Sequence, residues 1–293
     1  MKYISLSNSG DFIKSPLSYI PIKSLFSDRE ISLDFNGYNF LNEPVVLIQS
    51  LFGDSSNLLE LLFAIDVINR NTSFKPHILL PYMSYSRQDR EISQFSPISA
   101  KVIAKIISMQ EISSVSIVDL HSPQIQGFFE KPCFNILLED FFLEHIIQYY
   151  DIKNVAIVSA DIGGAKTARK IAEKLGCVSA IVEKCRPKAG VSYAMSLVGD
   201  VSGKICIIID DIIDSAGTLC NAGDMLMQNG ALSVLAYASH GIFSGSAFDK
   251  IENSAIQKVF VSNTIIQNAF GKVNVLNASS FILKKFEEKV KNF

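Results

Sequence analysis

The chain has 293 residues, of which 48% are hydrophobic, and its 27 basic and 29 acidic residues leave a formal net charge of -2. A chain of this length and composition can bury a large core in one or two domains, which excludes a disordered protein. No basic block stands out in the sequence, so the charge balance argues against a nucleic-acid-binding protein.

The cysteines and the chain start indicate where the protein works. None of the five cysteines forms a CxxC pair, and an odd number fits no closed disulfide framework, which is typical of reduced cytosolic proteins. The first 15 residues lack the apolar core of a signal peptide. No apolar stretch approaches the ~20 residues of a membrane span. We therefore expect a cytoplasmic protein with no membrane partner. The cysteines are Cys133, Cys177, Cys185, Cys206 and Cys220.

The first half of the chain alternates apolar runs with helical patterns. Continuous apolar runs at 44–50, 75–85 and 114–121 predict strands, whereas 58–70 and 98–109 show the apolar spacing of helices. Strands that are apolar throughout, with helices between them, are typical of a parallel sheet covered on both faces.

The second half repeats this pattern, with strands expected at 154–161, 177–184 and 204–211. Helices are expected between Ala165 and Gly176 and over 217–229, and a last helix over 279–292 could pack on either half. The sequence therefore predicts two similar α/β domains, 1–145 and 146–293, each a parallel sheet flanked by helices.

The segment IIIDDIIDSAGTL, residues 207–219, places carboxylates and small residues at the end of an apolar strand. In open parallel sheets, ligands bind at the carboxyl ends of the strands. Small residues let backbone N–H groups approach an anion, and the following helix directs its positive end there. The turn is thus a candidate phosphate site, to which Ser215 and Thr218 add hydroxyl donors.

The carboxylates of Asp210 and Asp211 would repel a phosphate but suit two neighbouring sugar hydroxyls. A phosphate and a diol together predict a sugar-phosphate ligand. The alternative is that the aspartates only cap the helix and the small residues only form a tight turn.

This segment resembles the sugar-phosphate loop of the type I phosphoribosyltransferase superfamily, which contains transferases and the ribose-phosphate pyrophosphokinases. Other segments are similar to the pyrophosphokinases, in the order and at the spacings of that family. The resemblance implies a phosphoribosyltransferase-like fold in both domains, with ATP bound by the first and ribose 5-phosphate by the second. The similar segments are 81–90, 97–107, 119–129, 158–176, 183–187, 199–219 and 240–245.

The resemblance implies an enzyme that transfers pyrophosphate from ATP to the C1 hydroxyl of ribose 5-phosphate, giving phosphoribosyl pyrophosphate and AMP. Matched residue by residue, it implies catalytic Lys184 and Arg186 and a Mg²⁺ held by His121 and Asp161. It implies ATP contacts from Asp28, Arg29, Glu30, Arg87 and Gln88. It implies ribose 5-phosphate contacts from Asp210, Asp211, Asp214, Ser215, Ala216, Gly217 and Thr218.

The chemistry of the residues agrees with this reading, because pyrophosphoryl transfer needs charge neutralisation and positioning. A Lys-x-Arg pair on a strand, as in Lys184 and Arg186, directs both cations to one side. Two alternatives stay open: a transferase that consumes phosphoribosyl pyrophosphate, and a catalytically weak regulatory paralogue, which the few basic residues in loop 90–96 would suit. The resemblance further implies a homo-oligomer, a hexamer built from dimers, in which residues 26–30 reach a neighbouring subunit's ATP site.

Overall fold

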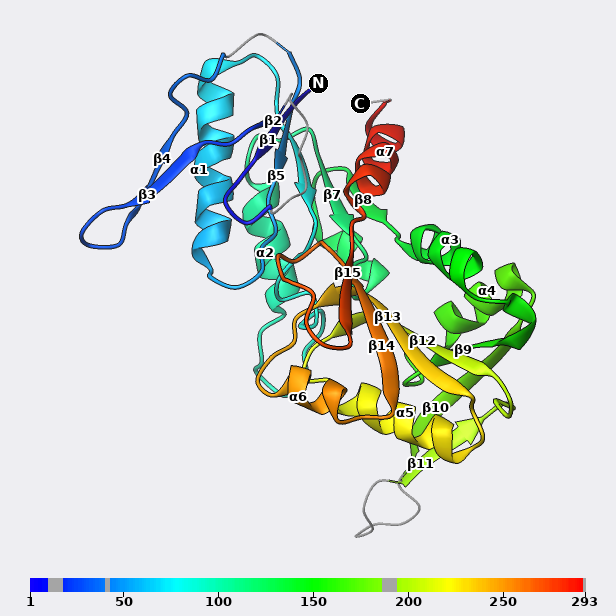
Figure 1. Ribbon diagram of the computed structural model, residues 1–293. Helices are drawn as coiled ribbons and strands as arrows, with labels where there is room; N and C mark the ends of the chain where they lie inside the picture. The colour runs from blue at the N-terminus through cyan, green and yellow to red at the C-terminus, as the bar shows by residue number, and fades with distance from the viewer. Residues whose placement is uncertain (10–17, 40–42, 186–193, 292–293) are drawn as a thin grey trace. The chain divides into compact units, whose positions relative to one another are not determined.

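The computed structural model describes residues 1–9, 18–39, 43–185 and 194–291 and divides the chain into two compact units (Figure 1). Unit 1 comprises Met1–Leu137, Asn263–Ile266 and Ala278–Phe293, and unit 2 comprises Leu138–Ser262 and Gln267–Asn277. The units change over between Leu137 and Leu138, before the expected boundary at 145/146, and the last helix belongs to unit 1. The expected ranges 1–145 and 146–293 therefore differ from the compact units in two places, at the boundary between the halves and at the C-terminal helix.

Unit 1 contains a six-stranded sheet with the strand order β2-β1-β5-β6-β7-β8, in which every neighbouring pair is parallel. Its central strands are buried along their whole length, as the apolar runs predict. The sheet strands are β1 (Lys2–Ser5), β2 (Ser18–Tyr19), β5 (Val45–Ile48), β6 (His77–Leu80), β7 (Ser114–Val118) and β8 (Cys133–Ile136). The helices of this unit are α1 (Ser56–Asn71), α2 (Ser99–Ser108), the 3-10 helix η2 (Pro123–Phe128) and α7 (Ser279–Val290).

The two faces of the unit 1 sheet are covered by different helices. Alternate strand residues, such as Ile78, share a core with residues of α1 and α2. The preceding residue, His77, faces the other way and meets the ring of Phe286 from α7, with the ring centroids 6.2 Å apart. Its Nδ1 also lies 2.8 Å from the Ser114 hydroxyl, so this buried histidine has a structural role.

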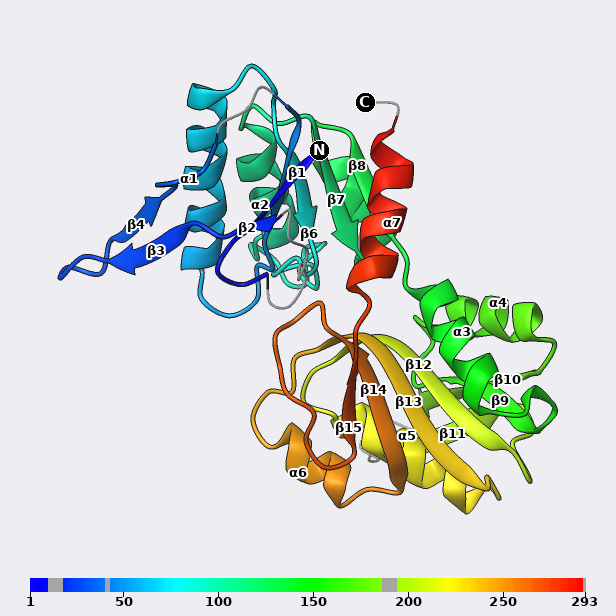
Figure 2. The same cartoon turned by 45° about the horizontal axis from the view of Figure 1, so that its top comes forward.

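A separate antiparallel hairpin, β3 (Ile22–Leu25) and β4 (Ile31–Asp34), extends away from the unit 1 sheet beyond α1 (Figures 1 and 2). Within the described residues its two strands pair only with each other. The turn at its tip is formed by Phe26–Glu30, where Arg29 has a φ of 72°.

Unit 2 contains a seven-stranded sheet with the order β11-β10-β9-β12-β13-β14-β15, which is parallel except for the pair β10–β11. The strands are β9 (Val155–Ser159), β10 (Val178–Cys185), β11 (Ala194–Val198), β12 (Ile205–Ile213), β13 (Ser233–Gly241), β14 (Ile256–Ser262) and β15 (Val273–Leu276). The helices are α3 (Glu139–Tyr149), the 3-10 helix η3 (Ile152–Asn154), α4 (Ala165–Leu175), α5 (Gly217–Gln228) and α6 (Ala247–Glu252).

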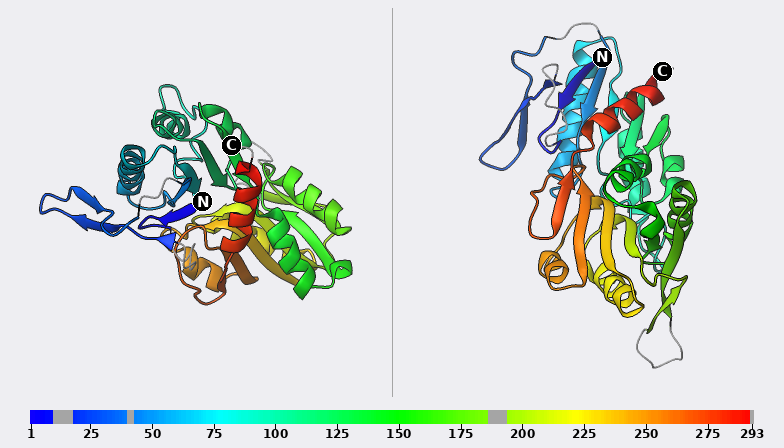
Figure 3. Two further views of the ribbon diagram at one scale, coloured as in Figure 1. Left: turned by 90° about the horizontal axis from the view of Figure 1, so that it is seen from above. Right: turned by 45° about the vertical axis from the view of Figure 1, so that its right-hand side comes forward.

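Helices also cover both faces of the unit 2 sheet (Figures 1 and 3). On one face, Ala236 and Ala238 of β13 share a core with Ala222 and Leu226 of α5. On the other, the fully buried Tyr237 packs against α3, where its hydroxyl lies 2.8 Å from His145 Nδ1. The small residues on the first face let α5 approach the sheet closely.

The predicted fold class, an α/β fold with helix-flanked parallel sheets, is confirmed, and individual strands differ in length. The run 75–85 forms a strand only as far as Leu80, because Pro81 has no N–H to continue the ladder. Strand β12 instead runs past 211 to Ile213. No helix in the described ranges has both the length and the apolar character required to span a membrane.

Candidate active site

Strand β12 carries two adjacent carboxylates at the carboxyl end of the unit 2 sheet. Its pairing with β9 ends at Ile208, whereas its pairing with β13 continues to Ile213. Asp210 and Asp211 therefore lie inside the strand but beyond its last partner on the β9 side. This is the edge at which open parallel sheets bind their ligands.

The surroundings of Asp210 disfavour the ionised form of its carboxyl group. Burial raises the pKa of Asp210 to about 8, and the charges of Asp211 and Asp161 act in the same direction. A hydrogen bond of 2.9 Å from the Asp211 amide to Asp210 Oδ1 opposes this effect only in part. A ligand that donates hydrogen bonds here would stabilise the ionised carboxylate.

The turn between β12 and α5 has an unusual backbone. Ala216, a buried residue, has a φ of 59°, in the left-handed region that few non-glycine residues occupy. Helix α5 then begins at Gly217, where an added Cβ would meet no atom within 4 Å. The start of α5 is therefore sterically open to an anion, at the helix end that carries a partial positive charge.

The other predicted residues of this turn differ in exposure. Ser215 is exposed, while Asp214 and Thr218 are half-buried. Lys250 of α6, which no sequence pattern indicates as a site residue, donates a 3.1 Å hydrogen bond from its Nζ to the Ser215 carbonyl. Lys250 brings a cation to the candidate phosphate turn, and nothing in the segment around it signals this contact, because it is made across 35 residues.

Asp161 lies in the turn that connects β9, the neighbour of β12 in the sheet, to α4. Its Oδ1 accepts a 2.9 Å hydrogen bond from the Gly164 amide, while its carbonyl accepts one of 2.6 Å from the Ser159 hydroxyl. A Cβ at Gly164 would lie 2.6 Å from Ser159 Oγ, so this close turn requires glycine. Asp161 itself is exposed, which leaves its second carboxylate oxygen available to a ligand.

The two predicted catalytic cations are described only in part. Lys184 lies in β10, where its backbone pairs with Met195 of β11. Arg186 follows the end of β10 and lies outside the described residues.

In unit 1, Arg87 and Gln88 follow β6, in the loop that leads to α2. Arg87 is exposed, whereas Gln88 is half-buried and accepts a 2.6 Å hydrogen bond from the Ser99 hydroxyl through its side chain. The Gln88 carbonyl also accepts a hydrogen bond from the Ala100 amide. Gln88 thus fixes the start of α2, a structural role in addition to its predicted contact with the nucleotide.

His121 follows β7, the neighbour of β6 in the sheet, and is exposed. Asp119, just before it, has a φ of 38°, and the Leu120 amide is held by Asn135 Oδ1 at 3.0 Å. Because β6 and β7 are parallel, their following loops place Arg87 and His121 at the same edge of the unit 1 sheet.

The remaining predicted ATP contacts, Asp28, Arg29 and Glu30, are exposed in the turn of the β3–β4 hairpin. Asp28 Oδ1 accepts a 3.0 Å hydrogen bond from the Glu30 amide, which closes the turn. The hairpin extends away from the sheet edge that carries Arg87 and His121 (Figures 1 and 2). The fold of unit 1 therefore separates these two groups of predicted ATP contacts.

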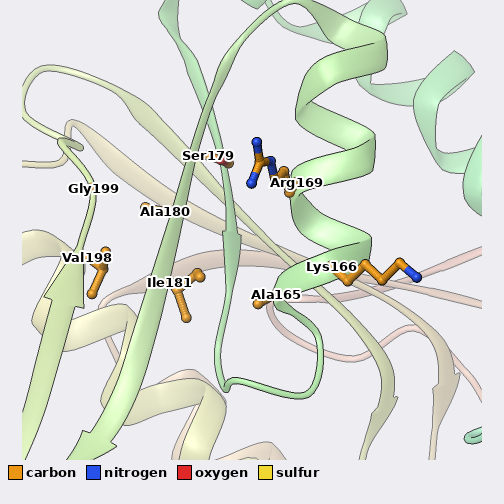
Figure 4. Close-up of a pocket in the computed structure, with 8 residues that line it drawn as sticks. All are labelled: Ala165, Lys166, Arg169, Ser179, Ala180, Ile181, Val198 and Gly199. Carbon is orange, nitrogen blue, oxygen red and sulfur yellow. The ribbon is translucent and has the colours of Figure 1, made fainter.

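A pocket of about 560 Å³ lies beside α4 and includes none of the predicted site residues. The Arg169 guanidinium lies towards Ser179, whereas the Lys166 side chain extends away from the strands (Figure 4). Arg169 is also paired with Glu173 at 3.1 Å. The lining residues are Ala165, Lys166, Arg169, Ser179, Ala180, Ile181, Val198 and Gly199.

Two family models match the chain. Residues 11–110 match the N-terminal domain of ribose phosphate pyrophosphokinase, and residues 177–284 match the phosphoribosyl synthetase-associated domain.

Curated relatives named ribose-phosphate pyrophosphokinase match most of the chain. The protein from Rhizobium meliloti is 40% identical over 256 residues, 87% of this chain and 82% of the relative. The protein from Vibrio parahaemolyticus is 42% identical over 266 residues, 88% of this chain and 84% of the relative. The crystal structure of phosphoribosylpyrophosphate synthetase from Mycobacterium smegmatis superposes with a TM-score of 0.88 at 26% identity, covering 100% of this chain and 99% of that one. The chain belongs to the ribose-phosphate pyrophosphokinase family.

Proposed function

We propose that the protein is a ribose-phosphate diphosphokinase, which transfers the pyrophosphoryl group of ATP to the C1 hydroxyl of ribose 5-phosphate. The observation that carries this proposal is a pair of adjoining features in unit 2. The half-buried carboxylates of Asp210 and Asp211 at the end of β12 are followed by the start of α5, where Gly217 leaves open space. Relatives with the corresponding name, each matched over more than four fifths of its length, support it.

Ribose 5-phosphate would bind across this turn. Its phosphate would accept hydrogen bonds from the amides and hydroxyls of residues 215–218, at the positive end of α5. Its ring hydroxyls would donate to Asp210 and Asp211, which stabilises the ionised form that burial disfavours. Asp214 would complete the turn.

The carboxylates of unit 2 fit a hard cation such as Mg²⁺, because the charges of Asp211 and Asp161 both disfavour the ionised form of Asp210. The described ranges hold no group of three or more acidic, histidine or cysteine side chains arranged as a complete metal site. Mg²⁺ in nucleotide enzymes is commonly held by one or two carboxylates together with substrate phosphates. We therefore propose Asp161 as a ligand in unit 2 and His121 in unit 1, with the metal neutralising phosphate charge when it is bound.

The other residues have roles set by charge. Arg87 would contact the nucleotide phosphates from unit 1, and Gln88 would hold the loop that carries it. Lys184 and Arg186 would neutralise the charge that develops on the transferred group. AMP then leaves with the electrons of the broken bond between the α-phosphate and the transferred group.

We further propose a homo-oligomer, a hexamer built from dimers, in which the turn Asp28–Glu30 serves a neighbouring subunit's ATP site. The separation of this turn from Arg87 and His121 within unit 1 supports that arrangement. A cytoplasmic location is proposed because the four cysteines with described side chains are all free.

Chromatography of a mixture of protein, ATP, ribose 5-phosphate and Mg²⁺ tests the function. AMP should form only when all four are present. AMP formation that does not require ribose 5-phosphate, or no AMP at all, contradicts the proposal. Protein carrying Lys184→Ala serves as the matched control, because its preparation would contain the same contaminating enzymes.

A further inference from the structure

A buried carboxylate interrupts the apolar face of α1. The Glu60 side chain is only 1% exposed, and it occupies a helical stripe whose next turns are purely apolar. An ionised group at such a position is costly unless it is paired and hydrogen-bonded. The contacts of Glu60 should therefore explain why a carboxylate lies there. The buried residues of α1 are Asn57, Glu60, Leu61, Ala64, Ile65 and Ile68.

The Glu60 carboxylate joins three separate segments of unit 1. Its Oε1 accepts a 2.8 Å hydrogen bond from the Ser7 amide, and the Ser7 hydroxyl donates to Oε2. Oε2 also accepts from Gln49 Nε2 at 3.2 Å and forms a 2.8 Å ion pair with Lys23 Nζ. The segments after β1 and β5 and the strand β3 therefore meet at one side chain.

Two of these three segments form a fixed platform. Gln49 Oε1 accepts a 3.1 Å hydrogen bond from the Asn8 amide, and the Asn8 side chain donates to the carbonyls of Ser50 and Phe52. Gln49 is fully buried. Lys23 connects the hairpin to this platform: its Nζ pairs with Glu60 and also donates a 3.2 Å hydrogen bond to the Ser7 hydroxyl.

The hairpin depends on such an anchor because a two-stranded hairpin has little stability of its own. Among the four residues of β3, Lys23 alone is not exposed. On β4, the residue opposite Lys23 is Leu33, which packs against the unit 1 core. One face of the hairpin thus has an apolar anchor on β4 and an ionic anchor on β3.

We infer that Glu60 is a positioning residue, which acts through Lys23 to hold the β3–β4 hairpin and its Asp28–Glu30 turn in place for the nucleotide. The inference rests on the proposed function, since it takes ATP as the ligand of that turn. Glu60 itself would touch no substrate. Without the ion pair, Lys23 would keep only its 3.2 Å hydrogen bond to the Ser7 hydroxyl. The turn would then sample orientations in which it cannot meet ATP.

Two variants separate positioning from folding. Glu60→Gln keeps the size of the side chain and removes its charge, and Lys23→Met removes the partner from the hairpin side while leaving the platform intact. Lys75→Ala is the matched control, because Lys75 pairs with Glu111 in the same unit, away from the hairpin and the predicted site.

Hydrogen exchange of the unliganded protein tests the anchoring without any reaction. Amides of residues 22–34 should exchange on the order of tenfold faster in both variants, through more frequent local opening, while β6 and β7 stay unchanged. The control should match the wild type throughout. Unchanged exchange of the hairpin in both variants overturns the inference.

Steady-state kinetics tests the link to the nucleotide. The KM for ATP should rise on the order of tenfold in both variants, the size of effect expected when one charge-assisted contact is lost. The KM for ribose 5-phosphate should stay the same. A fall in kcat alone, with both KM values unchanged, would indicate lost folded protein and would also overturn the inference. If the wild type forms no AMP, the proposed function is wrong. The hydrogen-exchange experiment then still tests, without any reaction, whether Glu60 anchors the hairpin.

Discussion

Asp210→Asn should make the unliganded protein more stable and its binding of ribose 5-phosphate weaker. Burial and the neighbouring carboxylates raise the pKa of Asp210 from 3.8 to about 8. The folded chain therefore holds this proton more tightly than the unfolded chain does. The contribution of the group to stability is complete below pH 3.8 and is lost progressively as the pH rises towards 8.

The size of the stability change follows from the interval between the two pKa values of Asp210, 3.8 and about 8. Each pH unit above 3.8 costs the folded protein about 1.4 kcal/mol until the pH reaches the folded-state pKa. The wild type thus loses ~2 kcal/mol by pH 5 and ~4 kcal/mol by pH 7. An asparagine does not titrate, so the stability difference between the variant and the wild type should grow by ~2–3 kcal/mol between these two pH values.

Urea unfolding of both proteins at pH 5, 6 and 7 measures this difference, with Asp249→Asn, an exposed site in the same unit, as the control. Calorimetric titration with ribose 5-phosphate should show an affinity roughly 10- to 100-fold lower, because a charged acceptor for the sugar hydroxyls is lost. A stability difference that does not change with pH would refute the electrostatic reasoning. An unchanged affinity would refute the place of Asp210 in the sugar site.

Four further changes test other parts of the site. Gly217→Ala should leave the melting temperature nearly unchanged, because its added Cβ meets open space, yet calorimetry should show about tenfold weaker binding of ribose 5-phosphate. Gly127→Ala, which also adds a Cβ in open space, is the control. Equal affinities of the two variants for ribose 5-phosphate would contradict an anion site at this turn. Lys250→Ala should raise the KM for ribose 5-phosphate several-fold at constant kcat, whereas a fall in kcat alone would remove Lys250 from the phosphate turn. Lys184→Ala should lower kcat by about 10²–10³-fold in steady-state assays, with little change in the KM for ATP, and near-normal turnover would exclude its catalytic role. Glu30→Ala and Lys184→Ala proteins, each nearly inactive alone, should regain partial activity when they are mixed under conditions that allow subunits to exchange. If subunits demonstrably exchange but activity does not rise, each ATP site is built within one chain.

The positions of the predicted sugar-phosphate residues in the fold could be predicted because a local sequence pattern determines them. Continuous apolar character marks β12, and the change to small residues marks the turn into α5, so Asp210 and Gly217 fall at the sheet edge. The exact strand end could not be predicted, because it depends on β13, which pairs with β12 as far as Ile213.

Features that depend on long-range contacts were missed. The contact of Lys250 with the turn depends on the position of α6, and the hydrogen bond of Gln88 depends on where α2 begins. Glu60 had a signal that could have been used, since it is an acidic residue in a helix stripe whose following turns are purely apolar. Only the folded chain identifies Lys23 as its partner.

The most direct test of the central claim is ³¹P nuclear magnetic resonance of the reaction of wild-type protein with ATP, ribose 5-phosphate and Mg²⁺. Transfer of an intact pyrophosphoryl group predicts AMP and phosphoribosyl pyrophosphate in equal amounts, with no signal from ADP or inorganic phosphate. Asp210→Asn protein should give the same products more slowly at limiting ribose 5-phosphate. Formation of ADP, or of AMP with free pyrophosphate, would contradict the account.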